Sequence, residues 1–227
     1  MKQVVITGAS KGVGYATALE FAKRGHKVLA IARSDSSLKA LCKASSELSG
    51  EIISHTGDLL EFEAGWVTQH LSAVDVLINN AGYLVNKPFA EISPEELQRS
   101  YAVNVFAPFR ILQALLGMLS EDAHIINIGS VGGVNGTQKF PGLTAYSSSK
   151  AATSCLSECW QAEFAQTGWS FNSLALGSVQ TEMLEQAFPG YRAQTTAEEM
   201  GEYIARFALN SGGLIKGKTQ IVSNSNP

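Results

Sequence analysis

Short runs rich in β-branched and apolar residues alternate with longer segments of helical period along the whole chain. The apolar runs lie at 3–7, 27–32, 51–56, 75–79, 124–129, 170–176 and 219–223. The helical segments lie between them, at 14–23, 36–48, 61–71, 94–119, 145–165 and 197–210. Runs such as VLIN are apolar without alternation, which is typical of parallel strands buried on both faces. The pattern therefore predicts an α/β fold, a doubly wound seven-stranded parallel sheet flanked by helices.

No composition shift, internal repeat or low-complexity segment divides the 227 residues, which predicts a single domain over 1–227. Lysine and arginine number 17 against 20 acids and form no long run, so no nucleic acid or membrane partner is expected and a small-molecule substrate is favoured. The start, MKQVVITGAS, does not resemble a signal peptide, and no apolar stretch reaches the length of about eighteen residues typical of a membrane span. We therefore expect a soluble, cytoplasmic protein.

The three cysteines, Cys42, Cys155 and Cys159, contain no pair with the CxxC spacing of a metal site. Cys155 and Cys159 lie one helical turn apart in an apolar stretch, where free cysteine is usually buried. We expect buried free thiols, no metal site and no redox role.

A glycine-rich turn, TGASKGVG, follows the first predicted strand and precedes a helical segment. Gly8, Gly12 and Gly14 leave the backbone free to approach a diphosphate, and the helix that follows presents unpaired amides to an anion. A glycine triplet alone is equally consistent with an ordinary strand-to-helix turn, but this position favours a dinucleotide site. The lysine of a GKS or GKT sequence is absent, which disfavours hydrolysis of a nucleoside triphosphate.

Four further motifs follow in order: NNAG at 79–82, Asn104 in a helical segment, Ser130 at a strand end, and YxxxK from Tyr146 to Lys150. With the glycine turn, this set resembles the short-chain dehydrogenase/reductases, and the similarity is greatest to the 3-oxoacyl-[acyl-carrier-protein] reductase type. The resemblance implies an NAD(P)-binding Rossmann-fold catalytic domain that transfers hydride between a nicotinamide dinucleotide and a carbonyl or alcohol. It also implies a homodimer or homotetramer assembled through the helices at about 94–119 and 145–165.

Tyr146 and Lys150 lie four residues apart and therefore share one face of a helix. An ammonium beside a phenol favours the phenolate, so we expect a pair that exchanges protons. By resemblance, Tyr146 exchanges a proton with the substrate oxygen, Ser130 hydrogen-bonds that oxygen, and Lys150 also binds the nicotinamide ribose. Asn104 would hold a water that connects Lys150 to solvent. These four are the expected catalytic residues.

The choice of dinucleotide depends on the end of the second strand, AIARS. Ala32 stands where an acid would bind the 2′-hydroxyl of NAD, whereas Arg33, with Lys11 of the glycine turn, would bind a 2′-phosphate. NADP is therefore expected and NAD is less favoured, although Asp35 lies nearby. By resemblance, Asp58 and Leu59 contact adenine, Asn80, Ala81 and Gly82 lie beside the adenosine ribose, and Val179 and Thr181 bind the carboxamide. The full expected set is Gly8, Ser10, Lys11, Gly12, Val13, Gly14, Arg33, Asp58, Leu59, Asn80, Ala81, Gly82, Tyr146, Lys150, Val179 and Thr181.

Two segments depart from the family pattern. The family reads PGxVxT where this chain has LGSVQT, so Leu176 replaces a proline that would stiffen the turn. The segment between Ser130 and Tyr146 is longer than usual and rich in glycine. Both changes bear on the nicotinamide and substrate ends of the site.

The segment at about 181–195 is expected to cover the substrate as a lid. The apolar side chains of this segment would either face the substrate or be part of the ordinary core, and the sequence favours neither. They are Met183, Leu184, Phe188 and Tyr191, and in the first case Phe140 and Leu143 would lie opposite them. His124 opens a predicted strand and is expected to be structural.

The residues leave more than one function open. A 3-oxoacyl thioester is one substrate class, and a sepiapterin-reductase-like or general carbonyl reductase is the alternative. A non-catalytic dinucleotide sensor is a remote alternative, because such a protein would be expected to lose Tyr146 or Lys150 and both are present. A sugar-nucleotide epimerase would need another glycine spacing and a large carboxyl-terminal domain.

Overall fold

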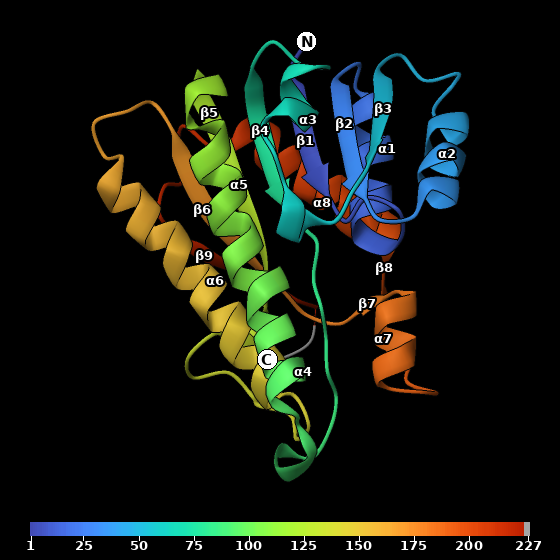
Figure 1. The fold of residues 1–227 in the computed structure, drawn as a ribbon, viewed down its shortest axis with the longest axis vertical. Helices are drawn as coiled ribbons and strands as arrows, with labels where there is room; N and C mark the ends of the chain where they lie inside the picture. The colour runs from blue at the N-terminus through green and yellow to red at the C-terminus, as the bar shows by residue number, and fades with distance from the viewer. Residues whose placement is uncertain (225–227) are drawn as a thin grey trace.

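The computed structural model describes residues 1–224, and its main sheet consists of seven parallel strands (Figure 1). Their order is β3-β2-β1-β4-β5-β6-β9, so the predicted doubly wound sheet is confirmed. The strands are β1 (Gln3–Thr7), β2 (Lys27–Ala32), β3 (Glu51–Thr56), β4 (Val74–Asn79), β5 (Leu119–Ser130), β6 (Ser170–Leu176) and β9 (Thr219–Val222). The order reverses between β1 and β4, and the carboxyl ends of these two strands are where such folds bind ligands. Residues 225–227 lie outside the described part.

Helices cover both faces of the sheet (Figure 1). One face carries α1 (Gly12–Lys23), α2 (Asp35–Ala44) and α8 (Ala197–Asn210), and the other carries α3 (Gly65–Thr68), α5 (Ala107–Leu115) and α6 (Thr144–Glu163). Successive strand residues point to opposite faces, so Val4 and Ile6 join the core of Phe21 and Ile204, whereas Val5 joins the core of Ile111. This explains why the strands are continuously apolar.

The helical stretch predicted at 94–119 begins as expected and then changes its winding. Ser93 and Glu96 form a capping box at the start of α4 (Pro94–Tyr101). A π-helical turn, Ala102–Phe106, joins α4 to α5. Pro108 has no N–H, so it cannot bond the carbonyl of Asn104 four residues earlier. The Thr153 hydroxyl of α6 donates to that carbonyl instead, at 2.7 Å.

The helix predicted at 61–71 is wrong in length. The Asp58 carboxylate accepts a hydrogen bond from the Leu60 amide at 3.1 Å and starts a separate 3-10 turn, Leu59–Glu61. Only Gly65–Thr68 is α-helical after it.

The expected burial of Cys155 and Cys159 is also wrong. Both are free and exposed on α6, with their sulfur atoms 3.9 Å apart. The helix buries the face that carries Ser149, Thr153 and Ser157, and the cysteines lie on another face. Their helical spacing was compatible with either face.

The segment expected as a lid is bounded by a second, two-stranded sheet. β7 (Val179–Gln180) pairs in parallel with β8 (Thr195–Thr196), and α7 (Glu182–Ala187) lies between them. Figure 1 shows α7 beyond the carboxyl ends of the main strands, separate from the helices that cover the sheet. The pairing therefore brings the two ends of this segment together.

One helical stretch, Pro94–Met118, is long and apolar enough by composition to cross a membrane. Ile111, Leu112 and Leu115 of this stretch are buried against the sheet, as in a core helix.

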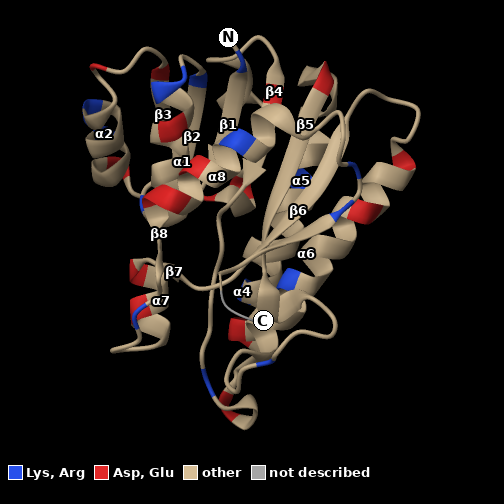
Figure 2. Ribbon diagram, turned by 180° about the vertical axis from the view of Figure 1, so that it is seen from behind, with Lys and Arg blue, Asp and Glu red and all other residues tan. Residues whose placement is uncertain are grey.

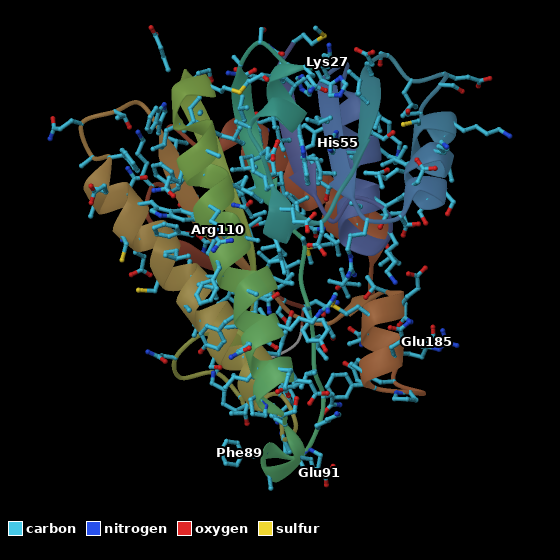
Figure 3. The ribbon with its side chains drawn as sticks, viewed as in Figure 1. Lys27, His55, Phe89, Glu91, Arg110 and Glu185 are labelled. Carbon is cyan, nitrogen blue, oxygen red and sulfur yellow. The ribbon has the colours of Figure 1, made fainter. Side chains whose placement is uncertain are left out.

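Lys and Arg are interspersed with Asp and Glu over the elements in Figure 2. Phe89 is 77% exposed, and Figure 3 shows it at the lower end of the molecule, beyond α4.

Candidate active site

The glycine turn lies against the segment after β4, and its glycines are required there. Gly8 and Gly12 have φ of 67° and 57°, which other residues rarely adopt. A Cβ on Gly8 would lie 2.7 Å from the Ala81 Cα, and one on Gly14 would lie 2.3 Å from the side-chain nitrogen, Nδ2, of Asn80. The turn therefore exposes bare backbone at the point where the strand order reverses, as binding of a diphosphate requires.

Thr7 and Asn80 hold this turn in place. The Asn80 side-chain amide donates to the carbonyls of Thr7 and Gly8, at 3.0 and 3.1 Å. The Thr7 hydroxyl accepts from the backbone amides of Asn80 and Ala81, each at 3.1 Å. Sequence reasoning did not assign a role to Thr7, although its place just before Gly8 was the available signal.

A cavity of about 780 Å³ opens above the turn, within the size range of ligand sites. The cavity brings together most residues of the expected site: Gly8, Ser10, Lys11, Gly12, Val13, Arg33, Asp58, Leu59, Asn80, Ala81, Gly82, Ser130, Tyr146, Lys150, Val179 and Thr181. Gly14 and Asn104 are not in its wall. Gly14 lies behind the Asn80 side chain, and Asn104 is buried behind Tyr83.

The part of the cavity next to the end of β2 carries a cation, Arg33, without a carboxylate partner among residues 1–224. Arg33 lines the cavity, is exposed and forms no salt bridge with the described residues. Asp35, the nearby acid that disfavoured NADP in the sequence, instead forms a 2.7 Å salt bridge with Lys39. Ser34 and Ser37 also line this end, and neither was singled out from the sequence. An unpaired guanidinium beside two hydroxyls is a suitable site for a phosphate.

Lys11 is engaged differently from the expectation that it serves a 2′-phosphate. Its ammonium forms a 3.1 Å ion pair with Glu182 of α7. Thr181, next to Glu182, places its methyl group 3.2 Å from where a Cβ of Gly12 would be. The glycine turn and the start of the lid helix are therefore in direct contact.

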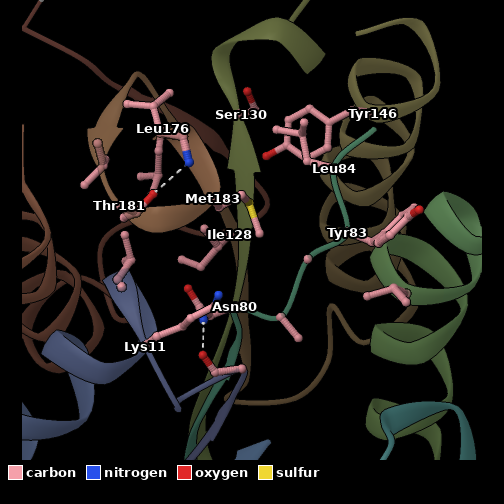
Figure 4. A pocket seen from close by; sticks show the side chains of 18 of the residues that line it. Lys11, Asn80, Tyr83, Leu84, Ile128, Ser130, Tyr146, Leu176, Thr181 and Met183 are labelled. Atoms are coloured by element: carbon pink, nitrogen blue, oxygen red, sulfur yellow. Dashed lines mark hydrogen bonds between the residues drawn. The ribbon is translucent and has the colours of Figure 1, made fainter. Parts of the chain in front are cut away.

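Ser130 and Tyr146 lie side by side at the other end of the cavity (Figure 4). Burial raises the pKa of the Tyr146 phenol to about 12, and a hydrogen bond with Ser130 partly opposes this increase. Desolvation of the phenolate is the larger of these two effects, and the acidification of the phenol by Lys150 stays a prediction. Tyr146 is consequently protonated at neutral pH, the form that can donate a proton.

Lys150 is buried, with 3% of its surface exposed. Its ammonium donates to the carbonyl of Ile128 at 2.7 Å and lies 5.8 Å from the centroid of the Tyr146 ring. Burial lowers its pKa to about 8. The lysine therefore remains mostly charged at neutral pH, and it can interact with a phenolate that forms beside it.

Asn104 has protein partners for its side-chain amide and for its backbone carbonyl. Its side chain accepts from the Tyr83 amide at 2.8 Å and donates to the Tyr83 carbonyl at 3.0 Å and the Ser149 hydroxyl at 2.8 Å. Its carbonyl accepts from Thr153 at 2.7 Å. Asn104, in the π-helical turn, thus joins α6 to the segment after β4, and its expected binding of a water stays a prediction.

The part of the wall expected to bind the carboxamide is formed by β6, β7 and the start of α7. Leu176, which replaces the family proline, is buried at the end of β6 and lines the cavity. The Thr181 hydroxyl accepts from the Leu184 amide at 3.3 Å and caps α7. Val179 is buried beside it. In Figure 4, Leu176 and Thr181 lie across the cavity from Tyr146, and Met183 lies between the two sides.

The wall near Tyr146 is apolar. Leu84 lies next to the Tyr146 ring in Figure 4. The apolar residues expected at this end all line the cavity: Phe140, Leu143, Met183, Leu184, Phe188 and Tyr191. The lid side chains are therefore not core, and Tyr191 retains 51% exposure. Tyr83, Arg99, Ile128 and Ser223 also line the cavity and were not identified from the sequence.

His124 is structural, as expected. It is buried, donates from Nδ1 to the Ala208 carbonyl at 3.0 Å and accepts at Nε2 from the Asn172 amide at 2.9 Å. It does not line the cavity. Within residues 1–224, no group of three or more His, Cys, Asp or Glu side chains is placed to hold a metal ion.

Comparisons with known proteins agree with this geometry. A sequence model described as short chain dehydrogenase matches residues 2–192. A fatty acyl-CoA reductase of Mycobacterium tuberculosis is 32% identical over 208 residues, covering 87% of this chain and 70% of that protein. A 3-oxoacyl-[acyl-carrier-protein] reductase of Thermotoga maritima is 30% identical over 192 residues, covering 82% and 77%.

A solved structure of a 3-oxoacyl (acyl-carrier-protein) reductase from Agrobacterium tumefaciens, with NADP bound, superposes with a TM-score of 0.88 at 25% identity. The match covers 99% of this chain and 93% of that one. The fold and the site define an oxidoreductase of the Rossmann type. The chain belongs to the short-chain dehydrogenase family.

Proposed function

We propose that this protein is an NADPH-dependent reductase of a carbonyl group carried on an apolar chain, with a 3-oxoacyl thioester as the substrate to test first. The observation that carries the proposal is the pair of hydroxyls of Ser130 and Tyr146, which lie together at one end of the cavity and are bordered by apolar side chains (Figure 4). The similarity to reductases of fatty acyl-CoA and 3-oxoacyl groups supports this substrate class.

The preference for NADPH rests on Arg33. Its guanidinium has no carboxylate partner among the described residues, and the nearby acid, Asp35, is paired with Lys39. Ala32 offers no carboxylate to a ribose 2′-hydroxyl. The residues present fit a 2′-phosphate better than a free 2′-hydroxyl, because arginine makes charge-assisted hydrogen bonds to phosphate.

NADPH, when bound, supplies the hydride. Ser130 orients the substrate oxygen and stabilises the negative charge that grows on it. Tyr146 transfers its phenolic proton to that oxygen, which its raised pKa permits because the phenol is protonated. Lys150 then stabilises the phenolate and is placed to hold the ribose hydroxyls. Asn104 acts by positioning, since it holds the backbone of Tyr83 and the start of α6.

A substrate panel followed by NADPH absorbance tests the proposal. It includes acetoacetyl-CoA, an apolar aromatic ketone and a hydrophilic ketose, each assayed with NADPH and with NADH. We expect turnover of the first two with NADPH and little turnover of the ketose. A higher kcat/KM for acetoacetyl-CoA than for the aromatic ketone would favour a thioester reductase, and the reverse order would favour the alternative, a general carbonyl or sepiapterin-reductase-like enzyme. Preferred turnover of the ketose would overturn the apolar substrate class.

The remote alternative, a dinucleotide sensor, makes the opposite prediction. It requires tight NADPH binding with no consumption across the panel. The presence of Ser130, Tyr146 and Lys150 in one cavity favours catalysis.

We also propose a cytoplasmic homo-oligomer that uses α5 and α6. Phe106 and Phe109 are 52% and 47% exposed, and Phe109 lies 6.5 Å from the Trp160 ring of α6. Exposed aromatic side chains on adjacent helices favour burial against a second copy. Light scattering at micromolar concentration measures the state, and a monomer would refute it.

A further inference from the structure

The substrate end of the cavity is formed by three segments distant in sequence. They are the stretch after β4 with Leu84, the loop before α6 with Phe140 and Leu143, and the lid helix α7 with Met183 and Leu184. None of these segments belongs to the main sheet. The shape of this end therefore depends on how the three segments hold one another.

Asn86 lies where these three segments meet. Its side-chain amide donates to the Ala187 carbonyl at 2.7 Å, across 101 positions of sequence. The amide of the next residue, Lys87, donates to the Gly142 carbonyl at 3.1 Å. Gly142 has a φ of +87°, and a Cβ there would lie 2.0 Å from the Asn86 Oδ1. The Asn86 side chain thus occupies the space that the glycine leaves open.

Ala187 is the last residue of α7, and the final carbonyls of a helix have no partner within the helix. Asn86 supplies such a partner. It is exposed and does not line the cavity, so it is not placed to touch a substrate. Any effect of Asn86 on the reaction would therefore act through the position of α7.

The two ends of α7 are attached to different parts of the site. The first turn contacts the glycine turn through the ion pair of Glu182 with Lys11, at 3.1 Å. The last residue is attached to the substrate side through Asn86. A change at the first turn should affect the cofactor, and a change at the last residue should affect the substrate.

We propose that Asn86 is a positioning residue that holds α7 over the substrate end of the cavity and thereby sets the KM for the carbonyl substrate. The proposal rests on the proposed reductase function. Loss of the Asn86 hydrogen bond lets the end of α7 move away, which weakens apolar contacts to the substrate without altering Ser130 or Tyr146. The expected signature is a higher KM with kcat and NADPH affinity retained.

The variant that tests this is Asn86→Asp, which keeps the shape but replaces the donor by an ionised carboxylate. Asn135→Asp is the matched control, since Asn135 is exposed on the neighbouring loop, does not line the cavity and gains the same charge. The measurements are kcat and KM for the best carbonyl substrate, NADPH Kd by fluorescence, thermal unfolding, and hydrogen exchange of α7 amides such as Phe188, which bonds the Leu184 carbonyl at 2.8 Å.

In Asn86→Asp we expect KM to rise about three- to ten-fold, the range of one lost hydrogen bond, and α7 amides to exchange faster by a similar factor. The kcat, NADPH Kd and thermal midpoint should match Asn135→Asp. An unchanged KM and exchange rate, or an equal rise of KM in the control, would overturn the proposal. A wild-type protein without turnover would count against the reductase function, while the exchange of α7 would still decide the role of Asn86.

Discussion

The ammonium of Lys150 lies 5.8 Å from the centroid of the Tyr146 ring and is hydrogen-bonded to the Ile128 carbonyl. The two groups are thus neighbours: Lys150 is buried, Tyr146 is half-buried in the cavity wall, and desolvation makes each charge costly. Burial accordingly raises the pKa of Tyr146 to about 12 and lowers that of Lys150 to about 8. A protonated phenol beside a charged ammonium suits carbonyl reduction. The phenol carries the proton to be donated, and the ammonium stabilises the phenolate that forms.

Removal of the phenol should abolish turnover but leave binding intact. In Tyr146→Phe we expect kcat to fall about 10²- to 10⁴-fold, the usual contribution of a positioned acid. NADPH Kd, measured by fluorescence, should change less than three-fold. Tyr203→Phe on α8, outside the cavity, is the control and should match the wild type. Retention of more than a tenth of the wild-type kcat would show that another group donates the proton.

The pH dependence of reduction should be governed by Lys150. Its folded pKa of about 8 lies below that of Tyr146, so it loses its proton first as the pH rises. We expect kcat/KM for NADPH to be level near pH 7 and to fall above about pH 8. A profile recorded from pH 6 to 10 checks this. A rate that stays level to pH 10 would mean that the neutral amine suffices.

Arg33 should determine the choice of dinucleotide. In Arg33→Ala we expect kcat/KM with NADPH to fall about ten- to hundred-fold, the loss of a charge-assisted contact, with little change for NADH. Lys39→Ala is the control, because Lys39 pairs with Asp35 and does not line the cavity. An equal loss with both dinucleotides would place Arg33 away from the 2′-position.

Acid should destabilise the fold through His124. Burial lowers its pKa to about 4, against about 6.5 in an unfolded chain. Between these values the unfolded state binds more protons, so the free energy of unfolding decreases as the pH falls from about 6.5 to about 4. The loss should approach about 3 kcal/mol.

Urea unfolding of the wild type and His124→Gln at several pH values measures this contribution. The variant removes the titrating group, so its free energy of unfolding should depend less on pH within that window. Identical pH dependence in both proteins would assign acid sensitivity to other groups.

Sequence alone determined the sheet and most of the wall of the cavity. Apolar runs that alternate with helical segments specify a parallel α/β fold, because the periodicity of each segment matches the face that the segment buries. The glycines before α1, the NNAG motif, Ser130 and YxxxK identified the cavity, because the carboxyl ends of parallel strands meet at one edge. The same rules failed at 61–71, where the Asp58 carboxylate caps a separate 3-10 turn and only Gly65–Thr68 is α-helical.

Only the tertiary structure showed the features that the spacing of residues along the chain does not determine. Spacing placed Lys150 beside Tyr146, but only the packing of α6 on β5 buried Lys150, gave its ammonium the Ile128 carbonyl and desolvated the half-buried phenol of Tyr146. Each pKa therefore shifts in the direction that disfavours the charged form. Helical period left the face of Cys155 open until α6 was packed. Asn86 reaches Ala187 only because folding brings together segments 101 residues apart. Local pattern fixes neighbours within one element, whereas desolvation and contacts between elements depend on the whole packed chain.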